Sequence, residues 1–164
     1  MTDVPNTPRP AEPSAADDWM LAHVAQLLDS YHALTGRRVY EGPEHGSALA
    51  RAVYHADFVL LSHGTESDPL FNYANLAAQR LFEMPWAQFV LTPSRESAEP
   101  RRQEARENVM RTVREKGYVD HYSGVRIAAS GRRFTIEEAT VWNVRSASGD
   151  LNGQAATFTA WRPL

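Results

Sequence analysis

The spacing of apolar residues predicts an amphipathic helix near the start of the chain. From Asp18 onward, apolar side chains recur every three or four positions and form one stripe, as in a helix with one buried face. The stripe consists of Met20, Val24, Leu27, Leu28, Tyr31 and Leu34. Asp18 is suited to cap this helix and Gly36 to end it. A second, shorter helix is predicted for residues 47–55.

A short hairpin and a further helix are predicted next. Residues 57–63 form a partly β-branched apolar run that ends at Gly64, which indicates a buried strand. Residues 70–73 are the expected partner strand, across a turn that contains Asp68-Pro69. Asn75 can then cap a helix that Pro85 ends. The apolar positions of this helix are Leu76, Ala77, Leu81, Phe82 and Met84.

The second half of the chain predicts one charged helix and three strands. A loop with Pro93 and Pro100 precedes the helix, residues 101–116, and Gly117 ends it. Its expected inward residues are Ala105, Val109, Met110 and Val113. Strands are predicted for residues 118–128 and 133–144, joined by a turn at Ser130-Gly131, and for residues 154–161 after Asn152-Gly153. The predicted fold is therefore α+β, with a five-stranded antiparallel sheet flanked by helices and preceded by the amphipathic helix.

Composition bounds the class of protein. The 164 residues are 43% hydrophobic and 23% charged, which is typical of one globular domain. A net charge of -3 and a pI of about 6.1 argue against a nucleic-acid-binding module. No apolar segment approaches the roughly 20 residues that span a bilayer, and no secretory signal is legible. With no cysteine, the chain has neither disulfides nor thiolate sites, so we expect a cytoplasmic protein.

The first residues differ from the rest in composition. Four of the ten prolines fall within the first 13 residues, where no apolar periodicity exists. We therefore expect a disordered, proline-rich tail over residues 1–16 and a single domain over residues 17–164.

The order of the predicted elements resembles a PAS domain, and short segments resemble the MEKHLA family more specifically. The matching segments are Phe71-Asn72-Tyr73-Ala74-Asn75-Leu76-Ala77-Ala78, Leu81-Phe82-Glu83-Met84, Pro93-Ser94-Arg95, Ser97-Ala98-Glu99-Pro100, Gly117-Tyr118, Tyr122-Ser123-Gly124-Val125-Arg126-Ile127, Ser130-Gly131-Arg132-Arg133-Phe134, Val141-Trp142-Asn143 and Gly153-Gln154-Ala155-Ala156-Thr157-Phe158. The resemblance covers about residues 18–164. It implies a PAS-like fold of the stand-alone bacterial type and a regulatory role through ligand or partner binding, without a reaction.

Cofactor chemistry is constrained by what the sequence offers. His55, Asp57 and His63 are the closest metal-ligand set, but strand geometry separates Asp57 from His63 by roughly 20 Å, so no metal site is predicted. In haem-binding PAS proteins the ligand is usually a histidine on the long helix, which residues 101–116 do not contain, so haem is not expected, with His121 left open as an unusual ligand. Flavin photochemistry through a cysteine is excluded, whereas simple flavin binding by apolar walls and an amide stays open.

No catalytic group is recognised. Ser62-His63 and the pair His121 and Ser123 lack a strand-turn-helix elbow, and Asp120 points away from His121 along a regular strand. The interleaved charges of residues 95–116 are typical of a solvated helix face. Three functions remain, in order of preference: a small-molecule sensor, an interaction module that forms a homodimer through the N-terminal helix, and an enzyme.

The expected ligand site rests on strand alternation. Gln154, Ala156 and Phe158, with Ala160, share one face of the last strand, and the alanines leave space that larger side chains would fill. On the preceding strand, Glu138, Thr140 and Trp142 share a face with Phe134 and Ile136 unless a bulge shifts the register. We expect these two faces to form adjoining pocket walls. Packing of the alanines against a helix is the alternative.

Overall fold

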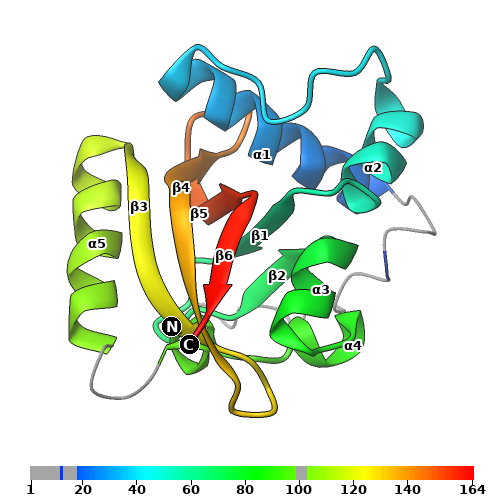
Figure 1. Cartoon of the computed structure of the whole chain (residues 1–164). Coiled ribbons are helices and arrows are strands. Elements are labelled where there is room, and N and C mark those ends of the chain that lie inside the picture. Colours follow the sequence, from blue (N-terminus) through cyan, green and yellow to red (C-terminus); the bar gives the residue numbers. More distant parts are fainter. Residues whose placement is uncertain (1–11, 13–17, 99–102) are drawn as a thin grey trace.

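A computed structural model describes residue 12, residues 18–98 and residues 103–164, and its arrangement is shown in Figure 1. The helices are α1 (Asp18–Thr35), α2 (Gly46–Tyr54), α3 (Leu76–Phe82), α4 (Trp86–Phe89), the 3-10 helix η2 (Ser94–Ser97) and α5 (Gln103–Lys116). The strands are β1 (Val59–His63), β2 (Phe71–Ala74), β3 (Tyr118–Ile127), β4 (Arg133–Arg145), β5 (Leu151–Phe158) and β6 (Ala160–Pro163). The expected tail, residues 1–16, lies outside the described part except for Glu12.

The strands form one antiparallel sheet in the order β2-β1-β5-β4-β3. This confirms the predicted α+β fold. The predicted last strand is divided at Thr159, and its second part, β6, pairs with the first half of β4. The last strand begins earlier than predicted, at Leu151, so that Asn152 and Gly153 lie within β5. A Cβ atom at Gly153 would lie 2.0 Å from the His63 carbonyl oxygen, so this position requires glycine for the close approach of β1.

Helix α1 covers one side of the sheet, which we call the outer face (Figure 1). Met20, Val24 and Leu27 of its stripe are fully buried there. Trp142 of β4 packs beneath the helix: its Nε1 donates to the Leu27 carbonyl oxygen at 3.1 Å, and its ring meets Tyr31 edge-on at 4.9 Å. The amphipathic helix is thus confirmed, and the sheet of the same chain buries most of its apolar stripe.

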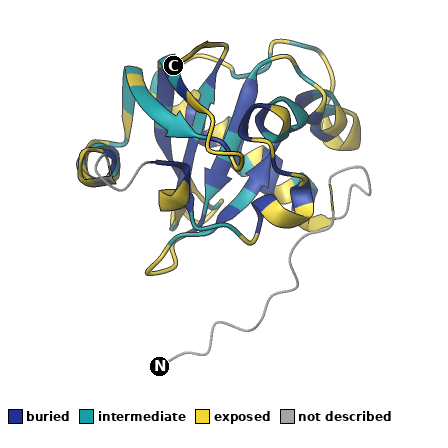
Figure 2. Cartoon of the chain, turned by 60° about the horizontal axis from the view of Figure 1, so that its bottom comes forward, coloured by how far each residue is buried: buried dark blue, intermediate teal, exposed yellow. Residues whose placement is uncertain are grey.

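The opposite side of the sheet, which we call the inner face, packs against α3, η2 and α5. Figure 2 shows that the exposed residues of the helices gather on the sides that face away from the sheet. Asn75 caps α3 as predicted, through a 3.1 Å bond from the Ala78 amide to its Oδ1. The helix ends at Glu83, whose φ is 58°, before it reaches Pro85. Pro85 instead begins α4, which together with η2 occupies much of the predicted loop.

Helix α5 presents a different face from the predicted one. Val113 is buried as expected, but Ala105 is exposed and its neighbour Arg106 is only 6% exposed. Residues 106, 109, 110 and 113 follow the i, i+3, i+4, i+7 spacing of a single helix face, and Ala105 does not belong to it. The interpretation of the charged side chains in residues 95–116 as a solvated helix face was therefore wrong at Arg106.

Strands β3 and β4 each carry one extra residue at the same point. His121 and Glu138 have left-handed backbones, with φ of 53° and 52°, and their side chains pair at 2.6 Å. The pairing register shifts between Val119 and Tyr122 and again between Tyr122 and Gly124. Because both strands are bulged, the register before and after is the same, yet the two faces of each strand are exchanged.

We expect the bulge to limit which residues position 138 accepts. Glu138→Gly fits the left-handed backbone, whereas the β-branched side chain in Glu138→Val does not. The valine variant should be about 1–3 kcal/mol less stable than the glycine variant in urea unfolding. Ser123→Val is the control, since Ser123 is exposed on β3 with an ordinary backbone. Equal stability of the two Glu138 variants would contradict this account.

A buried histidine joins α1 to the hairpin. His23 Nε2 lies 3.0 Å from Ser62 Oγ, and the Ser62 hydroxyl donates to Asn72 Oδ1 at 2.5 Å. Because the Ser62 hydroxyl already donates its proton to Asn72, His23 Nε2 must be the donor in the hydrogen bond between His23 and Ser62. Burial lowers the pKa of His23 from 6.5 to about 4. The unfolded chain binds a proton near pH 6.5 and the folded chain only near pH 4, so stability is lost as the pH falls between these values.

His23→Gln should make acid unfolding shallower. Glutamine can still donate to Ser62 but does not titrate, so the loss of unfolding free energy from pH 7 to pH 4.5 should shrink by about 2 kcal/mol. Chemical denaturation at several pH values measures this difference. His45→Gln, at an exposed position without a capping hydrogen bond, should leave the wild-type pH dependence unchanged. The same slope in wild type and His23→Gln would show that His23 does not control it.

Candidate functional site

A cavity of about 70 Å³ lies between the inner face of the sheet, η2 and α5. Its apolar lining is Leu61, Phe71, Phe82, Val109, Met110, Ile136, Val141, Ala155, Ala156 and Phe158. Its polar lining is His63, Ser94, Ser97, Arg106, Tyr122, Arg126 and Gln154. Since about 10–15 Å³ of such space is enough to hold one water, the cavity has room for several waters or one small molecule.

The wall predicted on the last strand lines this cavity. Gln154, Ala156 and Phe158 all contribute to the lining, because β5 is regular between them and its alternation holds. They lie opposite His63, Leu61 and Val59 of β1, respectively. Ala160 does not join them. It follows the break at Thr159 and is exposed on β6.

The wall predicted on β4 was wrong, because the bulge at Glu138 exchanges the faces. Glu138 itself is exposed and pairs with His121. Thr140 and Trp142 lie on the outer face, where the Thr140 hydroxyl donates to Asp120 at 2.7 Å and Trp142 packs under α1. Ile136 before the bulge and Val141 after it line the cavity instead.

The amide of Gln154 has a fixed orientation. Its Nε2 donates to the Met110 carbonyl oxygen of α5 at 2.8 Å and to Asn143 Oδ1 at 3.3 Å. A carbonyl oxygen can only accept, so the nitrogen must face Met110 and the Oε1 atom must face the other way. This oxygen is buried and accepts no hydrogen bond, because the neighbouring His63, with its proton on Nδ1 toward Gly64, could donate to it only when the imidazole is protonated on both nitrogens. Asn143, which sequence reasoning did not select, is held in turn by a 3.2 Å bond from its Nδ2 to the Arg114 carbonyl oxygen.

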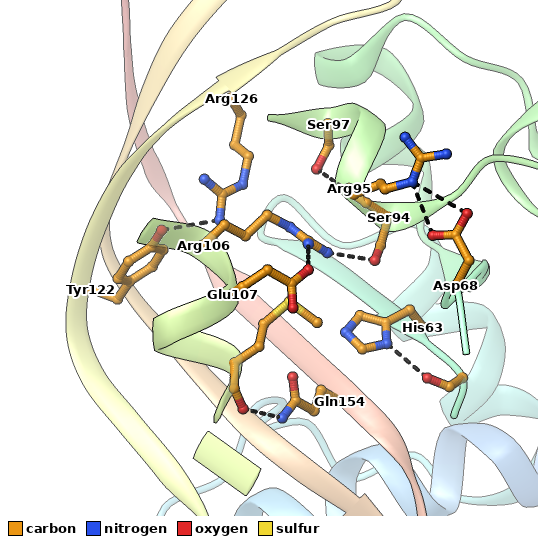
Figure 3. A network of polar contacts seen from close by, with 12 residues as sticks. His63, Asp68, Ser94, Arg95, Ser97, Arg106, Glu107, Tyr122, Arg126 and Gln154 are labelled. Carbon is orange, nitrogen blue, oxygen red and sulfur yellow. Dashed lines mark hydrogen bonds and ion pairs between the residues drawn. The ribbon is translucent and has the colours of Figure 1, made fainter. Parts of the chain in front are cut away.

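His63 lies beside Gln154 on the paired strand, as Figure 3 shows. Its Nδ1 is 2.9 Å from the Gly64 carbonyl oxygen, so Nδ1 carries the proton and Nε2 is an acceptor. Burial lowers the pKa of His63 to about 4. At neutral pH the imidazole is therefore uncharged.

Arg106 is the buried cation of the site (Figure 3). It donates from Nη2 to Ser94 Oγ at 2.5 Å and from Nη1 to Glu107 at 3.2 Å. Burial, with the nearby charge of Arg126, lowers the pKa of Arg106 to about 10, so it stays protonated at neutral pH. Sequence reasoning missed Arg106, although its helical spacing with the apolar residues of α5 was a usable signal.

The cavity continues into an open groove. This groove has a volume of about 630 Å³ and lies between α5 and the connection from β1 to β2. The groove and the cavity share His63, Ser94, Arg106, Met110 and Gln154. At its rim, Arg95 and Asp68 form an ion pair at 3.1 Å. The shared residues therefore form the mouth between enclosed space and solvent.

In the described part of the chain, the other candidate groups do not form a catalytic or metal-binding site. Ser62 and His63 point to opposite faces of β1, so they do not form a nucleophile and base pair. Within residues 18–98 and 103–164, no three metal-ligating side chains come together. In the same part of the chain, none of the helices combines the length and hydropathy that crossing a membrane requires.

Solved structures of similar shape are PAS and light-oxygen-voltage (LOV) domains. A PAS domain from Colwellia psychrerythraea has a TM-score of 0.57 at 14% identity, covering 71% of this chain and 93% of that one. The fungal blue-light photoreceptor Vivid, in its light-state dimer, has a TM-score of 0.57 at 16% identity, covering 82% and 91%. A LOV domain studied with a flavin analogue has a TM-score of 0.56 at 14% identity, covering 71% and 84%.

Sequence comparison is more specific. No curated protein matches the chain significantly. The model of the MEKHLA domain family matches residues 21–163, which include every helix and strand around the cavity. The chain therefore belongs to the MEKHLA domain family.

Proposed function

We propose that this chain is a sensory or regulatory domain that binds a small molecule in the cavity between β5, β4 and α5. The observation that carries the proposal is that Gln154, whose side chain lines the cavity, has a buried Oε1 atom without a hydrogen-bond partner. Leaving a buried acceptor unsatisfied costs about 1–3 kcal/mol. A ligand that donates a hydrogen bond to this oxygen would remove that cost.

The same amide offers a route from ligand to signal. Gln154 and Asn143 both donate to backbone carbonyl oxygens of α5, at Met110 and Arg114. A ligand that draws on Gln154 therefore acts on a side chain that fixes the position of α5 on the sheet. Membership in the MEKHLA family and the PAS-like shape agree with such a sensory role.

The other candidate functions have less support. Dimerisation through α1 was inferred from an apolar stripe that needs a cover, and the chain's own sheet supplies most of that cover. For flavin, the apolar walls and the Gln154 amide are suitable, but three fused rings need more room than about 70 Å³. We therefore propose a ligand smaller than flavin.

Ala156→Leu should separate binding from folding. The larger side chain would fill the cavity, so ligands that raise the Tm of the wild type should no longer do so. Stability should change by less than about 1 kcal/mol if the space is real, whereas overpacking a solid core costs about 1–3 kcal/mol. Thermal shift against a library of small metabolites, with denaturant unfolding, measures both quantities.

Ala50→Leu is the matched control, because Ala50 is 1% exposed within the core on the outer face and does not line the cavity. It should cost about 1–3 kcal/mol and leave ligand binding in place. A large stability loss in Ala156→Leu, together with no compound that shifts the wild type, would reject the proposed function.

A further inference from the structure

The charged side chains that line the cavity itself are all of one sign, whereas Glu66, Asp68 and Glu107 lie farther out in the groove. Among the described lining residues, Arg106 and Arg126 are cationic and none is acidic. His63 is neutral at neutral pH, because its pKa is about 4. Arg126 donates to the Tyr122 hydroxyl at 3.1 Å and to the Val125 carbonyl oxygen at 2.8 Å, both uncharged groups. The cavity therefore has a positive potential that its own lining does not neutralise.

The carboxylate that Arg106 contacts lies outside the cavity. Glu107 follows Arg106 on α5, and its side chain is 52% exposed, whereas that of Arg106 is 7% exposed. An ion pair with a solvated carboxylate is screened and compensates a buried charge only weakly. Arg106 is thus a buried guanidinium that lacks a buried counter-ion in residues 18–98 and 103–164.

Free hydrogen-bond donors converge beside this charge. A guanidinium has five N–H groups, and Arg106 uses one toward Ser94 and one toward Glu107. Ser94 Oγ accepts from Arg106, and its own hydroxyl hydrogen has no acceptor in the described part of the chain. Ser97 donates to the Ser94 carbonyl oxygen at 2.7 Å, which holds the turn of η2 in place. The remaining N–H groups and the Ser94 hydroxyl form a donor set suited to a planar oxyanion.

This inference rests on the proposed function. We propose that the molecule bound in this cavity is a short aliphatic carboxylate, whose carboxylate group pairs with Arg106 and Ser94 at the mouth of the cavity. Its aliphatic body lies toward Ala156 and Phe158, and a hydroxyl group on that body donates to Gln154 Oε1. Gln154 supports this class independently of Arg106, since it is 5% exposed and its orphaned oxygen requires a donor.

The size of the cavity further restricts the class of ligand. The enclosed space of about 70 Å³ is roughly half of the ~150 Å³ cavity that holds a benzene molecule in another protein. An aromatic ring is therefore too large for the enclosed part. A body of about four carbons fits, provided that the carboxylate occupies the mouth, where the cavity joins the groove.

Isothermal titration calorimetry with paired probes tests whether binding requires the negative charge of the carboxylate. Butyrate, 3-hydroxybutyrate and 4-hydroxybutyrate are each compared with the corresponding amide, which keeps the shape and removes the charge. At least one hydroxylated carboxylate should bind with a Kd at least tenfold lower than its amide. It should also bind more tightly than butyrate, because it supplies the donor for Gln154.

Arg106→Met should remove the tenfold preference for the carboxylate. Arg111→Met, on the exposed side of the same helix, should keep it. Without added ligand, Arg106→Met should raise the Tm by about 2–4 °C, since a buried charge without a buried counter-ion is replaced by an apolar side chain. A Tm below that of the wild type would show that Arg106 is a structural group and would overturn the proposal.

The remaining outcomes distinguish this proposal from the broader one. If carboxylates and amides bind equally, or Arg106→Met binds the carboxylate as the wild type does, the carboxylate assignment is wrong. If none of the six probes binds but a neutral metabolite does, and Ala156→Leu abolishes that binding, the proposed function stands and the carboxylate assignment fails. If neither the probes nor the library binds, both fail.

Discussion

The paired bulge at His121 and Glu138 determines which side of the sheet the later residues of β4 occupy. Two extra residues opposite one another leave the strand pairing intact and exchange the faces of both strands. Trp142 is thereby directed under α1, where it packs in the outer core. Asn143 is directed to the inner face, where it meets Gln154. The α1 docking site and the polar end of the cavity thus depend on one local backbone feature.

The second consequence of that geometry is a mechanical link between cavity and helix. Gln154 and Asn143 bond to each other, and each also bonds to a carbonyl oxygen of α5. The helix is therefore held to the inner face by two amides as well as by the buried Val113. Arg106 lies on the same helix, one turn before Met110. A ligand that engages both Arg106 and Gln154 would bear on α5 at two points along its length.

Regular patterns in the sequence predicted the elements and one wall of the site. Strand alternation placed Gln154, Ala156 and Phe158 correctly because β5 is uninterrupted between them. It misplaced Thr140 and Trp142 because a left-handed glutamate causes the bulge, and a non-glycine residue gives no local signal for one. The helical spacing of Arg106 indicated its burial, but its contact with Ser94 could not be predicted, since it requires η2 to fold next to α5.

Buried polar groups without hydrogen-bond or charge partners can indicate a binding site when several of them lie close together. Asn75 shows a buried polar side chain that is fully satisfied: its Oδ1 accepts from Leu60 and Ala78, and its Nδ2 donates to two carbonyl oxygens. The Tyr73 hydroxyl is also buried without a partner, but it lies in the outer core, so it represents a cost of packing. Gln154 and Arg106 instead line the same cavity, and the Oε1 atom of Gln154 lacks a donor while the Arg106 guanidinium lacks a buried anion. Folding alone favours neither group there, whereas one small molecule that bears both a hydroxyl and a carboxylate would satisfy the two together.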